Sequence, residues 1–329
     1  MAVCFHGASA TLVVVLVASP LATATAQAAV AKRSVEFTLD NDLLAVRGAG
    51  PPPDYDYTQG MRVALAWSGA TSLVRQLLGR PPNCRSLEAV RAGCISTAIT
   101  LGQEIYTPRR DSSQPVPGER PYAGWLYASA TARRAKPGRV RSLGVELGVS
   151  GPPSLAEPVQ NGVHRMLRNQ PQLGWAHQLP TALGVTVRYG EGRRTERALG
   201  RSAVGDAVLR WSAAAGTVVT SLSAGADATL GLRGDLPWSP SEPEVPQPTR
   251  LYVRAGVRQD AVLRNVFVDG RGGSGRADRR LFVAQAEVAI GYRRRRFGLE
   301  YRHVARGREY TAQPSPHAYG SIVLTLRSF

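Results

Sequence analysis

Short segments in which apolar and polar residues alternate recur along this chain, and they constrain its fold more than any other feature. Alternation with a period of two is typical of a strand with one apolar and one polar face. No apolar stretch beyond residue 30 is long enough for a transmembrane helix. The alternating segments, separated by turn residues, are residues 34–46, 57–68, 95–106, 122–133, 140–150, 180–190, 200–215, 218–233, 250–259, 280–293, 296–304 and 318–329.

An even number of such strands favours a closed barrel, because closure leaves no backbone polar group unpaired in lipid. The last segment alternates over Leu324–Phe329, and its terminal phenylalanine resembles the C-terminal signature of outer-membrane barrels. The sequence therefore predicts an all-β fold, a twelve-stranded antiparallel transmembrane β-barrel. A soluble β-sandwich, which alternates in the same way, is the alternative. Residues 154–169 have helical spacing instead, so we expect a short helix there in an extracellular loop.

The N-terminal residues indicate export. Thr11–Leu21 is an apolar run, and a stretch rich in small residues follows it with Ala26-Gln27-Ala28 as a cleavage site. This order is typical of a secretory signal peptide, although residues 1–10 lack the usual basic residue. An uncleaved anchor is the alternative, against which Pro20 argues. We expect residues 1–28 to be the signal peptide and residues 29–329 the outer-membrane β-barrel domain.

Two cysteines remain after such a cleavage, since Cys4 would leave with the signal peptide. Cys84 and Cys94 lie close together in the chain, and an oxidising compartment would allow them to form a disulfide. The sequence alone does not show whether their geometry permits the bond.

The chain is strongly basic, with a net charge of +17, and its only lysines are Lys32 and Lys136. Arginine binds phosphate bidentately, so this excess indicates a phosphate-rich partner such as nucleic acid or lipopolysaccharide. The arginine codon usage of a GC-rich genome is the alternative explanation. Because no nucleic-acid-binding motif is present, we expect no nucleic-acid partner.

Unusual residues gather at one end of the predicted barrel. If both termini lie in the periplasm, odd-numbered strands run outward across the membrane and even-numbered strands run back to the periplasm. Connections between them then bring five segments to the outward rim, where a rigid scaffold can hold functional loops. These segments are residues 40–42, 54–58, 107–122, 151–175 and 265–270.

The acidic residues at this rim suggest a hard-cation site. Asn41 and Asp42 interrupt a strand in which both residue types are disfavoured. Their oxygens suit calcium, although a turn at the end of the strand would explain them equally well. Asp54 and Asp56 are either further ligands or part of a solvated loop.

A histidine in the central outward loop is the candidate general base. A neutral imidazole at His164 could deprotonate water, whereas His177, His303 and His317 compete with it on composition alone. No serine-nucleophile elbow, zinc helix or phosphate-binding loop is present. A base-activated water assisted by a metal is therefore the simplest hydrolytic scheme.

The sequence resembles the outer-membrane lipid A 3′-O-deacylase family at these residues, in order and through most of the chain after the signal peptide. The most specific matches are ERPYAGWLY and GPPSLAEPVQNGVH. The segments that carry the resemblance are Glu36–Leu43, Asp56–Arg62, Gln103–Pro108, Glu119–Tyr127, Gly144–His164, Gly174–Trp175, Asn265–Gly270 and Phe329.

The resemblance implies a twelve-stranded barrel and calcium-dependent hydrolysis of an ester-linked acyl chain of lipid A, by a mechanism like that of secreted phospholipase A2. It assigns His164 as the base that activates water and Asp42 to the calcium site. Asn41 and Thr58 would orient the substrate or stabilise the oxyanion.

Basic residues after the T-P block would suit a lipid A phosphate, and the candidates are Arg109, Arg110 and Arg120. The expected partners are lipopolysaccharide and outer-membrane lipid, and the expected state is a monomer. Two alternatives stay open: a passive porin or adhesion barrel, and an outer-membrane phospholipase, whose serine-histidine-asparagine pattern is not evident.

Overall fold

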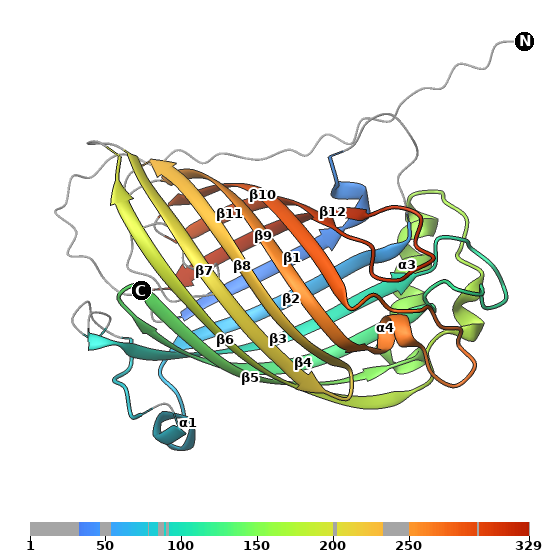
Figure 1. Cartoon of the computed structure of the whole chain (residues 1–329), viewed down its shortest axis with the longest axis horizontal. Coiled ribbons are helices and arrows are strands. Elements are labelled where there is room, and N and C mark those ends of the chain that lie inside the picture. Colours follow the sequence, from blue (N-terminus) through green and yellow to red (C-terminus); the bar gives the residue numbers. More distant parts are fainter. Residues whose placement is uncertain are drawn as a thin grey trace, which may run out of the picture.

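The computed structural model describes residues 33–46, 54–77, 79–84, 89, 92–199, 203–232, 250–294 and 296–328. The predicted signal peptide, the connection 234–249 and Phe329 lie outside these residues. The strands form one closed antiparallel barrel, in which each strand pairs with its neighbours in the chain and the first pairs with the last (Figure 1). They are β1 Arg33–Asn41, β2 Asp56–Ser68, β3 Cys94–Thr107, β4 Ala123–Lys136, β5 Arg139–Ser150, β6 Ala182–Ala198, β7 Ala203–Gly216, β8 Val219–Leu232, β9 Arg250–Asn265, β10 Phe282–Arg294, β11 Phe297–Arg306 and β12 His317–Ser328.

The predicted all-β class and the twelve-stranded barrel are confirmed, and the helix expected at 154–169 is α3, Ala156–Met166. The largest boundary errors are in β6, which continues to Ala198 rather than ending at residue 190, and in β9, which continues to Asn265 rather than ending at residue 259. Charged side chains obscured the alternation there. Asp260 points into the barrel and pairs with Arg258 and Arg306, so a charged residue belongs on that face.

The two faces of the wall differ sharply in polarity. On β1, the outward side chains of Phe37 and Leu39 are exposed, whereas Thr38 and Asp40 point inward and are buried. Asp40 pairs with Arg62 at 2.7 Å, and similar arginine–carboxylate pairs recur inside the barrel. An apolar outer wall and a polar interior are what a barrel surrounded by lipid requires. Much of the arginine therefore neutralises carboxylates of the protein itself.

The two ends of the barrel carry different connections (Figure 1). Helix α1, Ser72–Leu77, lies at the end where β1 begins, while α3 and α4, Val266–Asp269, lie at the other. All five segments with unusual residues meet at this second end, as their strand directions predicted. No helix of the described residues is long and apolar enough to cross a membrane.

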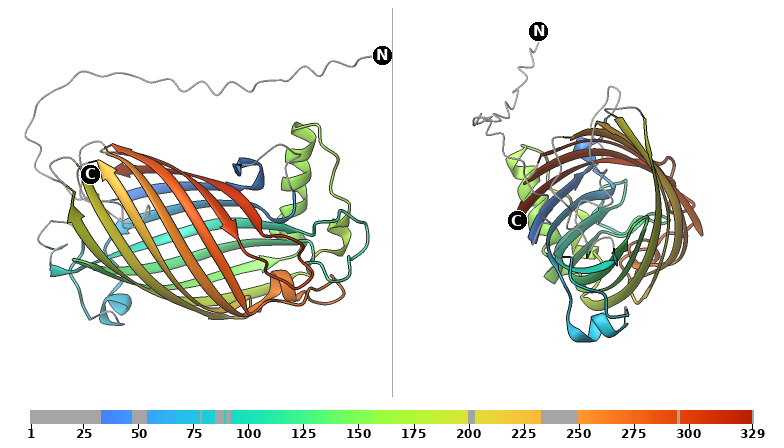
Figure 2. Two further views of the ribbon diagram at one scale, coloured as in Figure 1. Left: turned by 45° about the horizontal axis from the view of Figure 1, so that its top comes forward. Right: turned by 90° about the vertical axis from the view of Figure 1, so that its left-hand side faces the viewer.

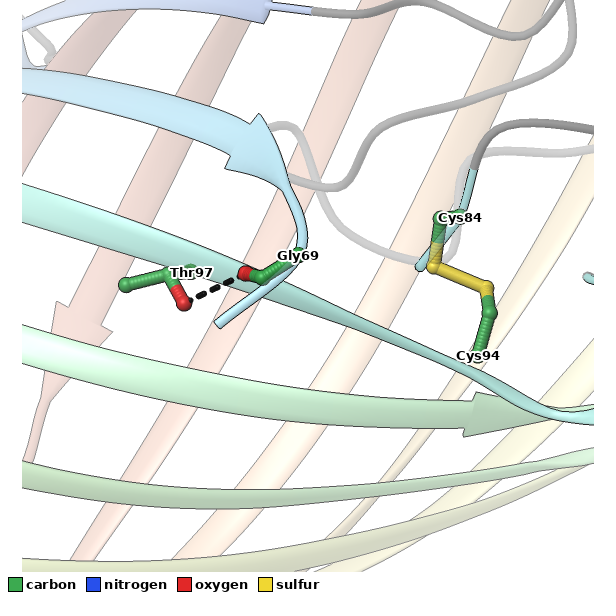
Figure 3. The surroundings of a disulfide bond; sticks show 4 residues. All are labelled: Gly69, Cys84, Cys94 and Thr97. Atoms are coloured by element: carbon green, nitrogen blue, oxygen red, sulfur yellow. Dashed lines mark hydrogen bonds between the residues drawn. A yellow bond between two sulfur atoms is a disulfide. The ribbon is translucent and has the colours of Figure 1, made fainter. Parts of the chain in front are cut away.

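The predicted disulfide between Cys84 and Cys94 is present on the β2–β3 connection, at the end that carries α1 (Figure 3). The Cα atoms of the two cysteines are 4.9 Å apart. Beside it, the hydroxyl of Thr97 donates a hydrogen bond of 2.7 Å to the carbonyl of Gly69, which ties the same connection to β3.

Candidate functional site

Helix α3 lies against the outside of the barrel wall near the rim, not over the lumen (Figure 2). The 3-10 helix η2, Pro152–Ser154, leads into it, and the Gln103 amide donates a hydrogen bond of 2.7 Å to the carbonyl of Ser154. Gly124 of β4 has no side chain, so the start of α3 can approach the wall closely. A buried apolar cluster then seats the helix: Ile105, Tyr122, Ala156 and Trp175, with Val159 packed against them.

The strand register aligns the outer wall in rows. One row runs across five strands through Gly320, Asn41, Gln59, Ile105 and Gly124. The row two residues below it contains Ile322, Leu39, Met61, Gln103 and Leu126. Two residues of an antiparallel strand span about 7 Å. Asn41 therefore lies one row above the apolar part of the wall.

Asn41 and Asp42 mark the point where β1 leaves the wall. The Asn41 side-chain oxygen accepts a hydrogen bond of 2.8 Å from the Leu43 amide and so caps the 3-10 helix η1, Asp42–Leu44. The turn at the end of the strand is thus confirmed for Asn41. Asp42 is buried at the start of the same turn.

Thr58 reaches the outer face through a bulge in β2, where the register with β3 shifts between Tyr57 and Gln59. Its hydroxyl oxygen lies 2.8 Å from that of Thr107, and Thr107 donates a hydrogen bond of 3.0 Å to the carbonyl of Asp54. Because Thr107 has a single hydroxyl proton, Thr58 must be the donor between the two threonines. Sequence reasoning used the block that contains Thr107 only to locate the arginines after it and gave Thr107 itself no role.

His164 lies in the last turn of α3, buried, with both ring nitrogens in contact with oxygen. Its Nε2 is 2.7 Å from Asp54 Oδ2, and its Nδ1 is 2.6 Å from the Gln170 carbonyl. The side-chain amides of Gln160 and Gln172 also donate to the Asp54 carboxylate, at 2.9 and 2.8 Å. Asp54 is therefore the neighbour of the candidate base.

The remaining acidic residue of this segment and the competing histidines are placed elsewhere. Asp56 is fully buried and accepts hydrogen bonds from Arg109, Tyr310 and Gln313, so the solvated-loop interpretation is wrong for it. His317 bonds to the Tyr57 carbonyl, and His303 accepts from the Val46 amide.

The three arginines proposed for substrate binding differ in accessibility. Arg109 is held between Asp56 and the backbone carbonyl of Ser315. Arg120 is buried, 3.2 Å from Glu309. Burial alone would lower the pKa of Arg120, but the combined attraction of Glu309, Asp56 and the neighbouring tyrosines outweighs it and raises the pKa, so this guanidinium stays charged. Arg110 has a side chain that is 70% exposed, and its ion partner is Glu119.

The chemistry of the candidate metal site is that of oxygen donors. The part of the chain that the structure describes contains no group of three or more histidine, cysteine, aspartate or glutamate side chains that could hold a metal ion. Calcium also accepts amide, hydroxyl, carbonyl and water oxygens. The Asn41 side-chain oxygen at the end of β1, the Asp42 carboxylate at the start of η1 and the Thr58 hydroxyl of β2 fit that preference.

One family model and one solved structure agree with the barrel. The family model described as outer membrane protein LpxR matches residues 10–328. The solved structure of LpxR from Salmonella typhimurium is similar, with a TM-score of 0.70 and 19% identity, over 89% of this chain and 99% of that one. The β domain of the Bordetella autotransporter BrkA has a TM-score of 0.43 and 12% identity, over 90% of this chain and 98% of that one. No curated protein sequence matches this chain.

Proposed function

Because the chain belongs to the LpxR family of outer membrane proteins, we propose that it is a calcium-dependent esterase that removes the 3′-linked acyl or acyloxyacyl chain from lipid A. One observation carries this proposal. The row that contains Asn41 lies on the outside of the barrel, directly above the lipid-facing wall. A site in this position meets a membrane lipid from the side, without the lipid leaving the bilayer.

A groove on the outer wall supports this placement. It has a volume of about 470 Å³ and begins one row below Asn41. Its lining is almost entirely apolar, with Gln103 at its upper edge. An acyl chain in this groove would place its ester carbonyl at the polar row. The apolar lining residues are Phe37, Leu39, Met61, Val63, Leu101, Leu126, Ile322 and Leu324.

In the proposed reaction, His164 takes a proton from a water molecule, which attacks the ester carbonyl. The Asn41 side-chain amide orients the carbonyl and stabilises its developing negative charge. The Thr58 hydroxyl, whose proton is directed to Thr107, helps to orient the substrate through its oxygen. Asp42 would hold calcium, which when bound supplies a positive charge that polarises the ester carbonyl. Of the three arginines, the exposed Arg110 is best placed to reach a phosphate of the lipid, whereas Arg109 and Arg120 are engaged within the protein.

Mass spectrometry of lipid A tests the proposal. Lipid A from cells that express the protein should lose the 3′-linked chain, and purified protein should need calcium for the same change. His164→Ala should produce a folded barrel that releases no fatty acid. His177→Ala, on the connection after α3, is the matched control and should remain active.

Three outcomes would contradict the proposal. An unchanged acylation pattern with and without calcium would argue against any deacylase activity. Conductance across planar bilayers without deacylation would indicate a porin. Fatty-acid release from glycerophospholipid in preference to lipid A, when both are offered together, would indicate a phospholipase.

A further inference from the structure

We infer that Asp54 is the positioning residue for His164 and that it selects Nδ1 as the nitrogen that takes the proton from water. This inference rests on the proposed function, and it adds a residue and an atom to that mechanism. It starts from the contact of 2.7 Å between Asp54 Oδ2 and His164 Nε2.

The Asp54 carboxylate is held in place on both of its oxygens. Gln160 donates to Oδ1 from α3, and Gln172 donates to Oδ2 from the segment after α3. The Trp175 indole N–H in turn donates to the Gln160 side-chain oxygen at 3.0 Å, which fixes the orientation of that amide. Two amide donors on one carboxylate, both more than a hundred residues from Asp54 in the sequence, are more than a solvated loop needs. They hold it as an acceptor facing the ring.

The partners of the ring determine where its protons lie. A backbone carbonyl and a carboxylate can only accept hydrogen bonds, so both contacts are hydrogen bonds only when the imidazole carries two protons. The contact of 2.6 Å to Gln170 and the contact of 2.7 Å to Asp54 together fit the protonated ring. A neutral ring has one N–H and can keep only one of the two bonds.

The stronger acceptor retains that proton. Hydrogen bonds to a carboxylate are roughly twice as strong as those to a neutral carbonyl. The neutral ring therefore keeps Nε2–H toward Asp54 and carries its lone pair on Nδ1. A water molecule that takes the place of the Gln170 carbonyl gives its proton to Nδ1 as its oxygen bonds to the ester carbonyl carbon. The protonated ring then regains the Gln170 contact. When the bond between the acyl carbon and the alkoxide oxygen breaks, Nδ1–H passes its proton to that leaving oxygen.

The same carboxylate residue connects the base to the neighbouring hydroxyl pair. The Asp54 backbone carbonyl accepts from Thr107, which contacts Thr58. Asp54 thus joins His164 on α3 to Thr58 on β2. A displacement of Asp54 would change the distance between these two groups as well as the ring orientation.

Kinetics of Asp54 variants with purified barrel and lipid A test the inference. Asp54→Asn should lower kcat by about 10²- to 10⁴-fold, the range of general-base catalysis and of wrong-tautomer variants. KM and the half-saturating calcium concentration should stay within about threefold, since ground-state binding is unchanged. Asp54→Glu should restore part of kcat, because it returns a carboxylate to the ring. Asp278→Asn, exposed on the β9–β10 connection, is the matched control.

Several results would overturn the inference. A kcat for Asp54→Asn equal to that of the wild type would remove the positioning role. Recovery of kcat at high calcium would make Asp54 a metal ligand. If Asp54→Asn and Asp54→Glu lost kcat equally and both proteins were unfolded, the contact between Asp54 and His164 would have only a structural role.

A readout without substrate separates this inference from the proposed function. Nitrogen-15 spectra of histidine-labelled protein in micelles should show the neutral His164 ring with its proton on Nε2, and Asp54→Asn should shift it toward Nδ1–H. If the wild type leaves lipid A unchanged, the proposed function fails, while these spectra still decide the role of Asp54. A neutral wild-type ring with its proton on Nδ1 would refute that role.

Discussion

A single methyl group added at Gly124 should reduce the activity of this barrel without preventing its folding. A Cβ at residue 124 would meet Ser154 Oγ and Ala156 Cβ well inside van der Waals contact and would lie 3.0 Å from Ser154 Cβ. Ser154 cannot simply rotate away, because its hydroxyl donates to the Gly151 carbonyl at 2.6 Å. Since ordinary contacts between carbon atoms are about 3.5–4.0 Å, the start of α3 must retreat by roughly 1 Å.

This retreat should affect catalysis more than stability. Overpacking of this kind costs about 1–3 kcal/mol, which a closed barrel tolerates. His164 is on the same helix as Ala156, so a rigid shift of α3 moves the base. A misplacement of about 1 Å costs on the order of 10²-fold in rate. Gly124→Ala should therefore reduce kcat by about 10²-fold while the barrel still forms.

Gly162→Ala is the matched control on the same helix. A Cβ there would have its nearest neighbour, Arg165 Nη2, at 3.9 Å, which is ordinary contact. Replacing a helical glycine by alanine stabilises the helix by about 0.5–1 kcal/mol, so activity should be retained. Rates of fatty-acid release are compared with gel mobility before and after heating, which reports barrel folding. Wild-type kcat in Gly124→Ala would refute the claim that contact with the wall positions α3.

Two further predictions concern stability. Replacing both Cys84 and Cys94 by serine should lower the free energy of unfolding by about 3 kcal/mol, the loop-entropy value for a short closed loop. Activity per folded molecule should stay unchanged, because the disulfide is at the end of the barrel away from α3. A urea titration measures the unfolding free energy, and rates of fatty-acid release measured in parallel report the activity. Loss of activity in the folded double variant would contradict this prediction. Burial alone would raise the pKa of Glu309, but Arg120 and Arg306 outweigh it and lower the pKa to about 2. Its contribution, about 3 kcal/mol, is therefore complete above about pH 4.5 and lost as the pH falls toward 2. Glu309→Gln should remove that part of the acid sensitivity. If the unfolding free energy of the variant fell with decreasing pH as steeply as that of the wild type, the prediction would be wrong.

Alternation was sufficient to predict the barrel because its cause is local. Each strand must show an apolar face to lipid and a polar face to the interior, so the pattern is present in every segment by itself. The prediction was weakest at the ends of β6 and β9. In β9, Asp260 pairs with Arg306 of β11 as well as with Arg258 of its own strand. Because Arg306 is far from Asp260 in the sequence, the charged residues of this segment resembled a loop.

In the candidate site, too, local patterns were predictable from the sequence and contacts between distant segments were not. Strand parity was enough to bring Asn41, Asp42, Thr58 and His164 to one rim, and the resemblance to a known family supplied their expected roles. The sequence could not show that Asp54 meets His164, since they are joined across more than a hundred residues by the folding of α3 against the wall.

The sequence by itself determined the strands, their even number and the rim that carries the unusual residues, because these depend on short-range patterns and on strand direction. Only the tertiary structure decided which carboxylate faces His164, that Arg109 and Arg120 are engaged within the protein, and that the candidate site is on the outer wall. These outcomes depend on register and loop packing. A shift of one residue would turn Asn41 to the opposite face of the barrel.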